Sequence, residues 1–364
     1  MIEEEANIVL HEGDMKQVVS DEFETNTFGD WAYLAIAQHY RKMLSYEAGV
    51  LSDRDPEELH QMRVNMRRLR TALVGFASAL SLPATSGEKA VGKIARVLGQ
   101  LRDIDVLEET LKTEYRPQLP KAERKELDRI LNALAKERKQ AFKVVKQVLA
   151  GKAYRQLKKG FESWLANPQY SALACVPIEH ILPDLLLPRF GQFFLHPGWA
   201  VGGSIGDIPQ ERILPADPDT VRQILARQEI TLHDLRKEAK RTRYQMELFV
   251  QFYGEEYRNY LKETKQIQSI LGDIQDSFVL KEFLNHFFDK SFKTRLPALA
   301  KHLHKIRWHK WNAWQSLHYK FASPKTRQSL RTLAQHPQIS RGDLQTVSPD
   351  GIAIAKENAV STGK

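Results

Sequence analysis

The feature that most constrains this sequence is a long-range internal repeat. Residues 59–76 read LHQMRVNMRRLRTALVGF, and residues 232–249 read LHDLRKEAKRTRYQMELF. The same register, without a gap, aligns IARVLGQLRDIDVLEETL at 94–111 with IQSILGDIQDSFVLKEFL at 267–284. Two separate segments in one register are hard to obtain by chance, and the period is too long for a solenoid repeat. The repeat predicts two copies of a multi-helix unit, related by a pseudo-twofold axis.

Apolar residues recur at helical spacing through most of the chain, and no convincing run alternates as a strand would. The helices are expected at about 28–49, 56–80, 86–113, 121–149, 152–166, 231–253, 255–289, 293–321 and 324–335. The fold class is therefore all-α, a helical bundle of two halves around a basic central groove. The expected organisation is an N-terminal extension (1–27), half one (28–166), a Pro- and Gly-rich connector (167–230), half two (231–336) and a flexible tail (337–364).

The composition indicates the kind of partner and the cellular compartment. Lys and Arg number 54 against 45 acidic residues, a formal charge of +9, which points to an acidic partner. The one cysteine, Cys175, cannot form an intrachain disulfide and suits a reducing compartment. The acidic N-terminus does not resemble a secretory signal, and Pro183 and Asp184 interrupt the most apolar stretch. We expect a cytoplasmic protein with no membrane partner and no cofactor; the sequence does not indicate an oligomeric state.

The repeated helix carries only positive groups on its polar side. At about 100° per residue, the spacing 3, 4, 3 places one stripe of cations on each copy. These stripes are His60, Arg63, Arg67 and Arg70 in the first copy, and His233, Arg236, Lys240 and Arg243 in the second. Like charges one helical turn apart repel each other, so a solvated face usually mixes signs. A bound polyanion would offset the repulsion, and the planar fork of arginine suits phosphate.

Further basic residues lie at helical spacing outside the repeated helix. Lys136, Lys139, Lys143 and Lys146 form a stripe opposite apolar residues, for which an ordinary solvated face is an equally good interpretation. Additional cations of the same kind are Lys89, Lys93 and Arg96 in half one, and Lys262, Lys265 and Lys305 in half two. Asp103 and Asp276 are expected to orient arginines through ion pairs, and the tryptophans at 308, 311 and 314 are expected in the core.

Three other functions stay open at this point. A nucleic-acid-binding protein needs aromatic platforms beside its cations, and only Tyr244 adjoins the motif. A metal-dependent phosphohydrolase could use the dipeptide His233–Asp234, but the first copy has Gln61 in place of the acid and no second His/Asp cluster accompanies the pair. The third alternative is a structural adaptor that is basic only incidentally.

At HQMRVNMRRLR and LRDIDVL the sequence resembles the conserved-histidine α-helical domain, CHAD. The family pattern is roughly HxxRxxxRRLR followed by LGxxRDxDV. The residues that fit are His60, Arg63, Arg67, Arg68, Arg70, Leu98, Gly99, Arg102, Asp103, Asp105 and Val106. The second copy departs from the pattern at Lys240, Thr242 and Gln275, so the two halves need not contribute equally. The resemblance covers about residues 28–336.

This resemblance implies a compact all-helical domain that binds inorganic polyphosphate, often at polyphosphate granules. We therefore expect a non-catalytic module that holds long phosphate chains in one basic groove shared by both halves, with nucleic acid as the alternative ligand. The residues expected to bind polyphosphate are His60, Arg63, Arg67, Arg70, Lys89, Lys93, Arg96, Lys139, Lys143, His233, Arg236, Lys240, Arg243, Lys262, Lys265 and Lys305.

Overall fold

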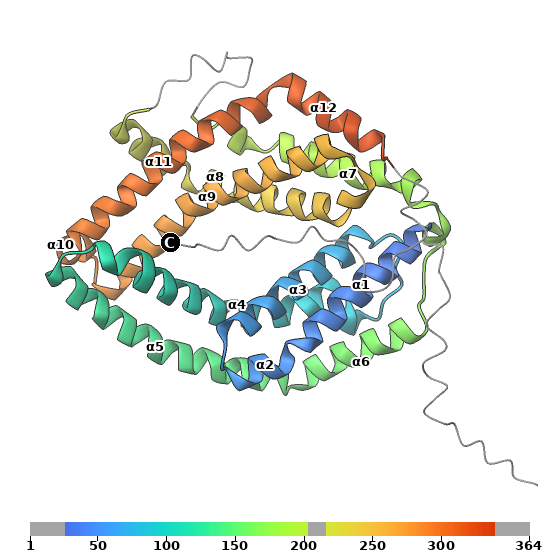
Figure 1. Cartoon of the computed structure of the whole chain (residues 1–364), viewed down its shortest axis with the longest axis horizontal. Coiled ribbons are helices and arrows are strands. Elements are labelled where there is room, and N and C mark those ends of the chain that lie inside the picture. Colours follow the sequence, from blue (N-terminus) through green and yellow to red (C-terminus); the bar gives the residue numbers. More distant parts are fainter. Residues whose placement is uncertain (1–25, 203–215, 339–364) are drawn as a thin grey trace, which may run out of the picture.

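The computed structural model describes residues 26–202 and 216–338, and within them the fold is all-α, as predicted (Figure 1). The only pairings of strand type in these ranges are two isolated bridges, Thr27–Pro177 and Leu80–Tyr170. Most of the expected N-terminal extension and tail lies outside the described residues. The longer helices are α1 (Phe28–Ser45), α3 (Pro56–Gly75), α4 (Glu88–Thr110), α5 (Lys121–Leu149), α6 (Lys152–Ala166), α7 (Ile178–Phe194), α8 (Pro218–Leu248), α9 (Glu255–Phe287), α11 (Pro297–Ala322) and α12 (Pro324–Gln335).

Helices α3 and α8 begin with the same local signal. In α3 the Asp55 side chain accepts a hydrogen bond from the Glu57 N–H at 2.8 Å, with Pro56 at the first helical position. In α8 the Asp217 side chain accepts from two backbone N–H groups at 3.0 Å, again just before a proline. An acidic cap followed by proline is a favourable helix start. The expectation that this helix begins near residue 231 is therefore wrong, because the start signal stands at Asp217.

The expected connector contains a helix of the bundle. Helix α7 packs against α8 and α12 although Pro183 and Pro188 lie inside it. An interior proline costs about 3 kcal/mol because it removes a backbone hydrogen bond. The side chains that offset this cost are buried along one side of the helix: Ile178, Leu182, Leu186, Phe190, Phe193 and Phe194. Each such burial contributes about 1.5–3 kcal/mol, so packing outweighs the prolines.

The bundle divides into two groups of helices along the chain. Figure 1 shows α1–α6 (blue to green) on one side and α7–α12 (green to red) on the other. In the first group α3 packs on α4, which packs on α5; in the second, α8 packs on α9, which packs on α11. Helices α3 and α8 also contact each other. The two repeated helices thus meet at the junction of the halves.

Within the described residues, two separate hydrophobic clusters join the halves. In the larger, Phe76 meets its repeat equivalent Phe249 with ring centroids 5.5 Å apart. Trp311 and Trp314 are buried in it, as predicted, whereas Trp308 is half-buried against it. The smaller cluster joins Leu127 and neighbours on α5 to α9, α10 (Phe292–Arg295) and α11 at the left end of Figure 1. The Glu123 carboxylate strengthens this junction by accepting hydrogen bonds from the first N–H groups of α11 at 2.9 and 3.2 Å. The twofold relation itself stays a prediction.

Candidate anion-binding site

Cations from both halves converge on the ring of Tyr244. The guanidinium carbons of Arg67 and Arg243 lie 4.9 and 4.7 Å from the ring centroid, and the Lys240 Nζ lies 6.0 Å from it. Arg67 comes from α3, whereas the other two come from α8. The apolar residues of each helix face the core, so the stripe of cations lies on the other side of the helix, at the junction of the two halves. Arg63 and Arg236 are close enough to Lys240 to act on its charge, and they complete what we call the cationic cluster: Arg63, Arg67, Arg236, Lys240 and Arg243.

Two glycines determine the path of Arg63 and Arg236. A Cβ placed on Gly99 of α4 would come too close to Nη1 of Arg63. At the equivalent Gly272 of α9, a Cβ would lie 3.1 Å from Nε of Arg236. Each arginine therefore crosses the neighbouring helix at a position that has no side chain. This crossing gives a physical reason for the Leu–Gly pair that occurs in both copies of the repeat.

An aspartate one turn after each glycine faces the same arginine. Nη2 of Arg63 lies 3.9 Å from the Asp103 carboxylate, and Nη2 of Arg236 lies 3.8 Å from that of Asp276. The predicted orienting ion pairs are thus confirmed. They are long, and the aspartate side chains are 79% and 69% exposed, so they neutralise the arginines only weakly.

The charge of the cluster is poorly compensated within the described residues. Arg67 and Lys240 form no ion pair with a carboxylate there, and the buried Nε atoms of Arg67 and Arg236 donate no hydrogen bond. Burial and the nearby Arg67 and Arg236 lower the pKa of Lys240 to about 8. Arg243 differs, because its Nε lies 3.0 Å from the Glu247 carboxylate. The cluster is an arrangement of cations that an anion would stabilise.

The two motif histidines flank this cluster in an environment that favours their neutral form. Burial lowers the pKa of His60, and Arg102 and Arg67 lower it further against an opposing effect of Glu57. Burial also lowers the pKa of His233, with Lys237 and Arg236 acting in the same direction. Both imidazoles are therefore largely neutral at pH 7, and a bound anion would favour their protonation.

Arg102 is a residue that the list of expected binding residues omitted. It lies close enough to lower the pKa values of both His60 and Arg63, and its own buried Nε donates no hydrogen bond within the described ranges. The signal was present in the sequence, since Arg102 is the arginine of the LGxxRD pattern. Its repeat equivalent is Gln275, so this cation is present in the first half alone.

Arg70 lies one turn after Arg67 on α3, but its side chain contacts α4. Its Nε donates to Glu88 Oε1 at 2.9 Å, and its guanidinium lies over Gly92 of α4. Lys89, Lys93 and Arg96 are exposed on a neighbouring side of α4, and Lys262 and Lys265 are exposed on α9. With about 100° between successive residues, these exposed cations lie on a side that adjoins the helix carrying the cluster. They could extend it along a linear ligand.

The lysines of α5 and α11 belong to helices other than the two that carry the cluster. Lys139 and Lys143 are exposed on the side of α5 opposite its buried residues Leu134 and Val145, and that buried side faces α4. Lys305 is exposed on α11. The predicted amphipathic pattern of α5 is confirmed, with its basic face exposed.

Comparisons with known proteins agree with this arrangement. The sequence profile of the CHAD domain matches residues 34–285, more than half of the chain. The protein belongs to the CHAD domain family. One similar solved structure is the CHAD domain from the plant Ricinus communis, with 22% identity and a TM-score of 0.52; the match covers 86% of this chain and 95% of that one. Another is PptA from Streptomyces chartreusis, with 16% identity and a TM-score of 0.53; the match covers 82% of this chain and 99% of that one. These likenesses show the shared fold. No curated protein matches the sequence.

The His233–Asp234 dipeptide of this CHAD protein does not assemble a metal centre within the described ranges. The Asp234 carboxylate pairs with Lys237 on its own helix at 2.8 Å. In residues 26–202 and 216–338, no group of three or more His, Cys, Asp or Glu side chains is placed to hold a metal ion. Within the same ranges, no helix is long and apolar enough to cross a membrane.

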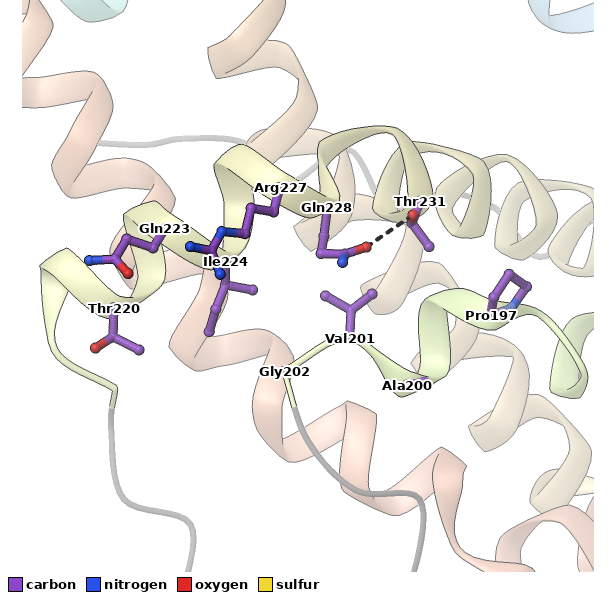
Figure 2. Close-up of a pocket in the computed structure, with 10 residues that line it drawn as sticks. All are labelled: Pro197, Ala200, Val201, Gly202, Thr220, Gln223, Ile224, Arg227, Gln228 and Thr231. Atoms are coloured by element: carbon purple, nitrogen blue, oxygen red, sulfur yellow. Dashed lines mark hydrogen bonds between the residues drawn. The ribbon is translucent and has the colours of Figure 1, made fainter.

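A cavity of about 450 Å³ lies elsewhere in this CHAD fold (Figure 2). It is bounded by the short helix η6 (Pro197–Ala200) and the first turns of α8, where Gln228 and Thr231 are hydrogen-bonded at 3.2 Å. Among its described lining residues, Arg227 is the one charged side chain. The cavity is thus distinct from the cationic cluster.

Proposed function

We propose that this CHAD protein binds long-chain inorganic polyphosphate without transforming it, through the cationic cluster between α3 and α8. The ligand class is the one that the family resemblance implies. The observation that carries the proposal is the convergence of Arg67, Lys240 and Arg243, from both halves, on one ring without full compensation by carboxylates. We place this activity in the cytoplasm, including at polyphosphate granules.

The cluster suits a linear chain of phosphates because its donors are numerous and spread over two helices. A guanidinium can donate two parallel hydrogen bonds to phosphate oxygens, and each charge-assisted contact contributes about 1.5–3 kcal/mol. Binding would also release counterions from the chain, which adds affinity that depends on salt. The exposed Lys89, Lys93 and Arg96 would follow the chain beyond the cluster.

Nucleic acid is the alternative ligand, and the structure gives it less support. Single strands bind through aromatic faces on which bases stack. Tyr244 is the aromatic residue at the cluster, and the guanidinium groups of Arg67 and Arg243 already lie against its ring. A polymer without bases uses the same cations and needs no aromatic face.

The test is titration calorimetry with long-chain polyphosphate, tripolyphosphate and single-stranded DNA. The paired changes Arg63→Ala with Arg67→Ala, and Arg236→Ala with Lys240→Ala, should each weaken long-chain binding by two or more decades, at about 1.5–3 kcal/mol per contact. The matched control, Lys139→Ala with Lys143→Ala, removes two exposed lysines of α5 and should change affinity little.

The shared site is wrong if either cluster pair leaves long-chain affinity intact while the protein stays folded. Tripolyphosphate should bind more weakly than the long chain, since it fills the cluster but does not extend to the exposed cations of α4 and α9. Tighter binding of DNA than of polyphosphate at equal charge would favour the alternative. Shortening of the polyphosphate during incubation, followed by gel electrophoresis, would contradict the non-catalytic part of the proposal.

A further inference from the structure

Lys240 differs chemically from its neighbours in the cationic cluster. The other four members are arginines, whose guanidinium groups stay protonated and are poor nucleophiles. Lys240 carries a primary amine, and its repeat equivalent in half one is Arg67. The residue is half-buried, and its Nζ lies 6.0 Å from the centroid of the Tyr244 ring. The second half thus places one nucleophile among groups suited to phosphate.

We propose that Lys240 is a site of acylation by small acyl phosphates, whose phosphate group the surrounding arginines hold. This inference rests on the proposed function, because it requires the cluster to bind phosphate groups. Phosphate held by Arg67 would lie beside the Lys240 amine, since the Arg67 guanidinium carbon and the Lys240 Nζ lie 4.9 and 6.0 Å from the centroid of the same Tyr244 ring. The arrangement would bring the acyl carbon to the nucleophile and raise its effective concentration.

The reaction is a simple acyl transfer that balances without an oxidant or reductant. The lone pair of the neutral Lys240 amine attacks the acyl carbon and forms a C–N bond. The bond between that carbon and the bridging oxygen breaks, and inorganic phosphate leaves with the electron pair. The amine proton passes to the departing phosphate or to water. The arginines stabilise the negative charge that the leaving phosphate gains.

In the free protein, before phosphate binds, the environment of Lys240 also favours the neutral form of its amine. With a pKa of about 8, roughly a quarter of the amine is neutral at about pH 7.5, against about 0.1% for an ordinary lysine. Lys237, one turn earlier on α8, is paired with Asp234 at 2.8 Å and is a matched reference on the same helix. Lys139 on α5 is a second reference, exposed and without a carboxylate partner within the described ranges.

Acylation would oppose polyphosphate binding, and polyphosphate would oppose acylation. The amide product is neutral, so the cluster loses one of its five cations and gains bulk. A bound polyphosphate chain would in turn cover the amine and occupy the arginines. The extent of modification at Lys240 would therefore register the balance between acyl phosphates and polyphosphate.

The experiment is incubation of the full-length protein with acetyl phosphate, followed by quantitative peptide mass spectrometry. Acetylation of Lys240 should be roughly tenfold or more faster than that of Lys237 and Lys139, because the arginines beside Lys240 hold the phosphate of the reagent next to its amine. Long-chain polyphosphate should suppress labelling at Lys240 and spare Lys139. Arg236→Gln should slow labelling by acetyl phosphate more than labelling by a neutral reagent, acetoxysuccinimide, which carries no phosphate.

Two results overturn the inference, and polyphosphate calorimetry distinguishes them. If polyphosphate binds but Lys240 is acetylated no faster than Lys139, the acylation site is wrong and the proposed function stands. If acetoxysuccinimide labels Lys240 rapidly while acetyl phosphate shows no preference and polyphosphate neither binds nor protects, the phosphate site itself is wrong. Lys240→Gln, which mimics the amide, should lower polyphosphate affinity at least tenfold, whereas Lys240→Arg should retain it.

Discussion

Replacing Lys240 with methionine should stabilise the free protein and weaken its binding of polyphosphate. The pKa of this lysine is near 8 instead of the ordinary 10.5 because of burial and the neighbouring Arg67 and Arg236. One pKa unit corresponds to about 1.4 kcal/mol, so charging the amine in the fold costs at most about 3 kcal/mol. Since the side chain is only half-buried, solvent and salt reduce this to about 1–2 kcal/mol.

Methionine keeps an unbranched stem of similar length and removes the charge. Thermal unfolding without ligand should therefore show a melting temperature about 2–5 °C higher for Lys240→Met than for the natural protein. The gain should shrink in about 0.5 M salt, where the repulsion is screened. Polyphosphate affinity should fall at least tenfold, for the loss of one charge-assisted contact of about 1.5–3 kcal/mol.

The matched control is Lys237→Met on the same helix. It removes an exposed lysine paired with Asp234 and should change the free energy of unfolding by less than about 0.5 kcal/mol. A melting temperature for Lys240→Met equal to or below that of the control would refute the repulsion argument. An unchanged affinity would show that the amine does not contact the ligand.

The other predictions concern the same cluster. By calorimetry, Gly99→Ala should lower polyphosphate affinity more than Gly272→Ala, and both should lose little stability. The new methyl group at residue 99 displaces the flexible end of Arg63, whereas at residue 272 it lies 3.1 Å from Arg236. Equal effects would contradict the crossing of Arg63 over Gly99. Polyphosphate affinity should fall as pH rises above about 8, because bound phosphate raises the pKa of Lys240 and binding therefore takes up a proton. Calorimetry in buffers of different ionisation enthalpy would detect this proton. The absence of proton uptake near pH 8.5 would refute the prediction. The logarithm of affinity should fall steeply with the logarithm of salt concentration, and a flat dependence would exclude an electrostatic site.

The helices and the cationic stripes were predictable because they depend on local periodicity. Met62, Met66 and Leu69 alternate with the cations at helical spacing, and the structure buries all three. The repeat further predicted that two such stripes belong to one site. Helix α7 was harder to predict because Pro183 and Pro188 are local signals against a helix, and burial against α8 and α12 overrides them.

Periodicity also cannot say which amphipathic helix turns its basic side toward a partner helix. Helix α5 and helix α3 both pair a basic stripe with an apolar one. In α5 the apolar side packs on α4, and Lys139 and Lys143 face outward. In α3 the stripe meets α8 because the halves are joined through Phe76 and Phe249. Long-range packing decides the direction of each basic side, and the spacing of residues within one helix does not contain this information.

Because the two hydrophobic clusters join the halves, the fold does not depend on the charges of the cationic cluster. The halves are held together by apolar contacts such as that of Phe76 with Phe249, and by the cluster around Leu127. Charges at the α3–α8 junction can therefore be exchanged without loss of the fold, provided that the apolar faces are kept. The second copy shows such exchanges: Lys240 stands at the position equivalent to Arg67, and Gln275 at the position equivalent to Arg102. The two halves thus bring unequal sets of cations to one junction, while the apolar contacts that join them are unaffected.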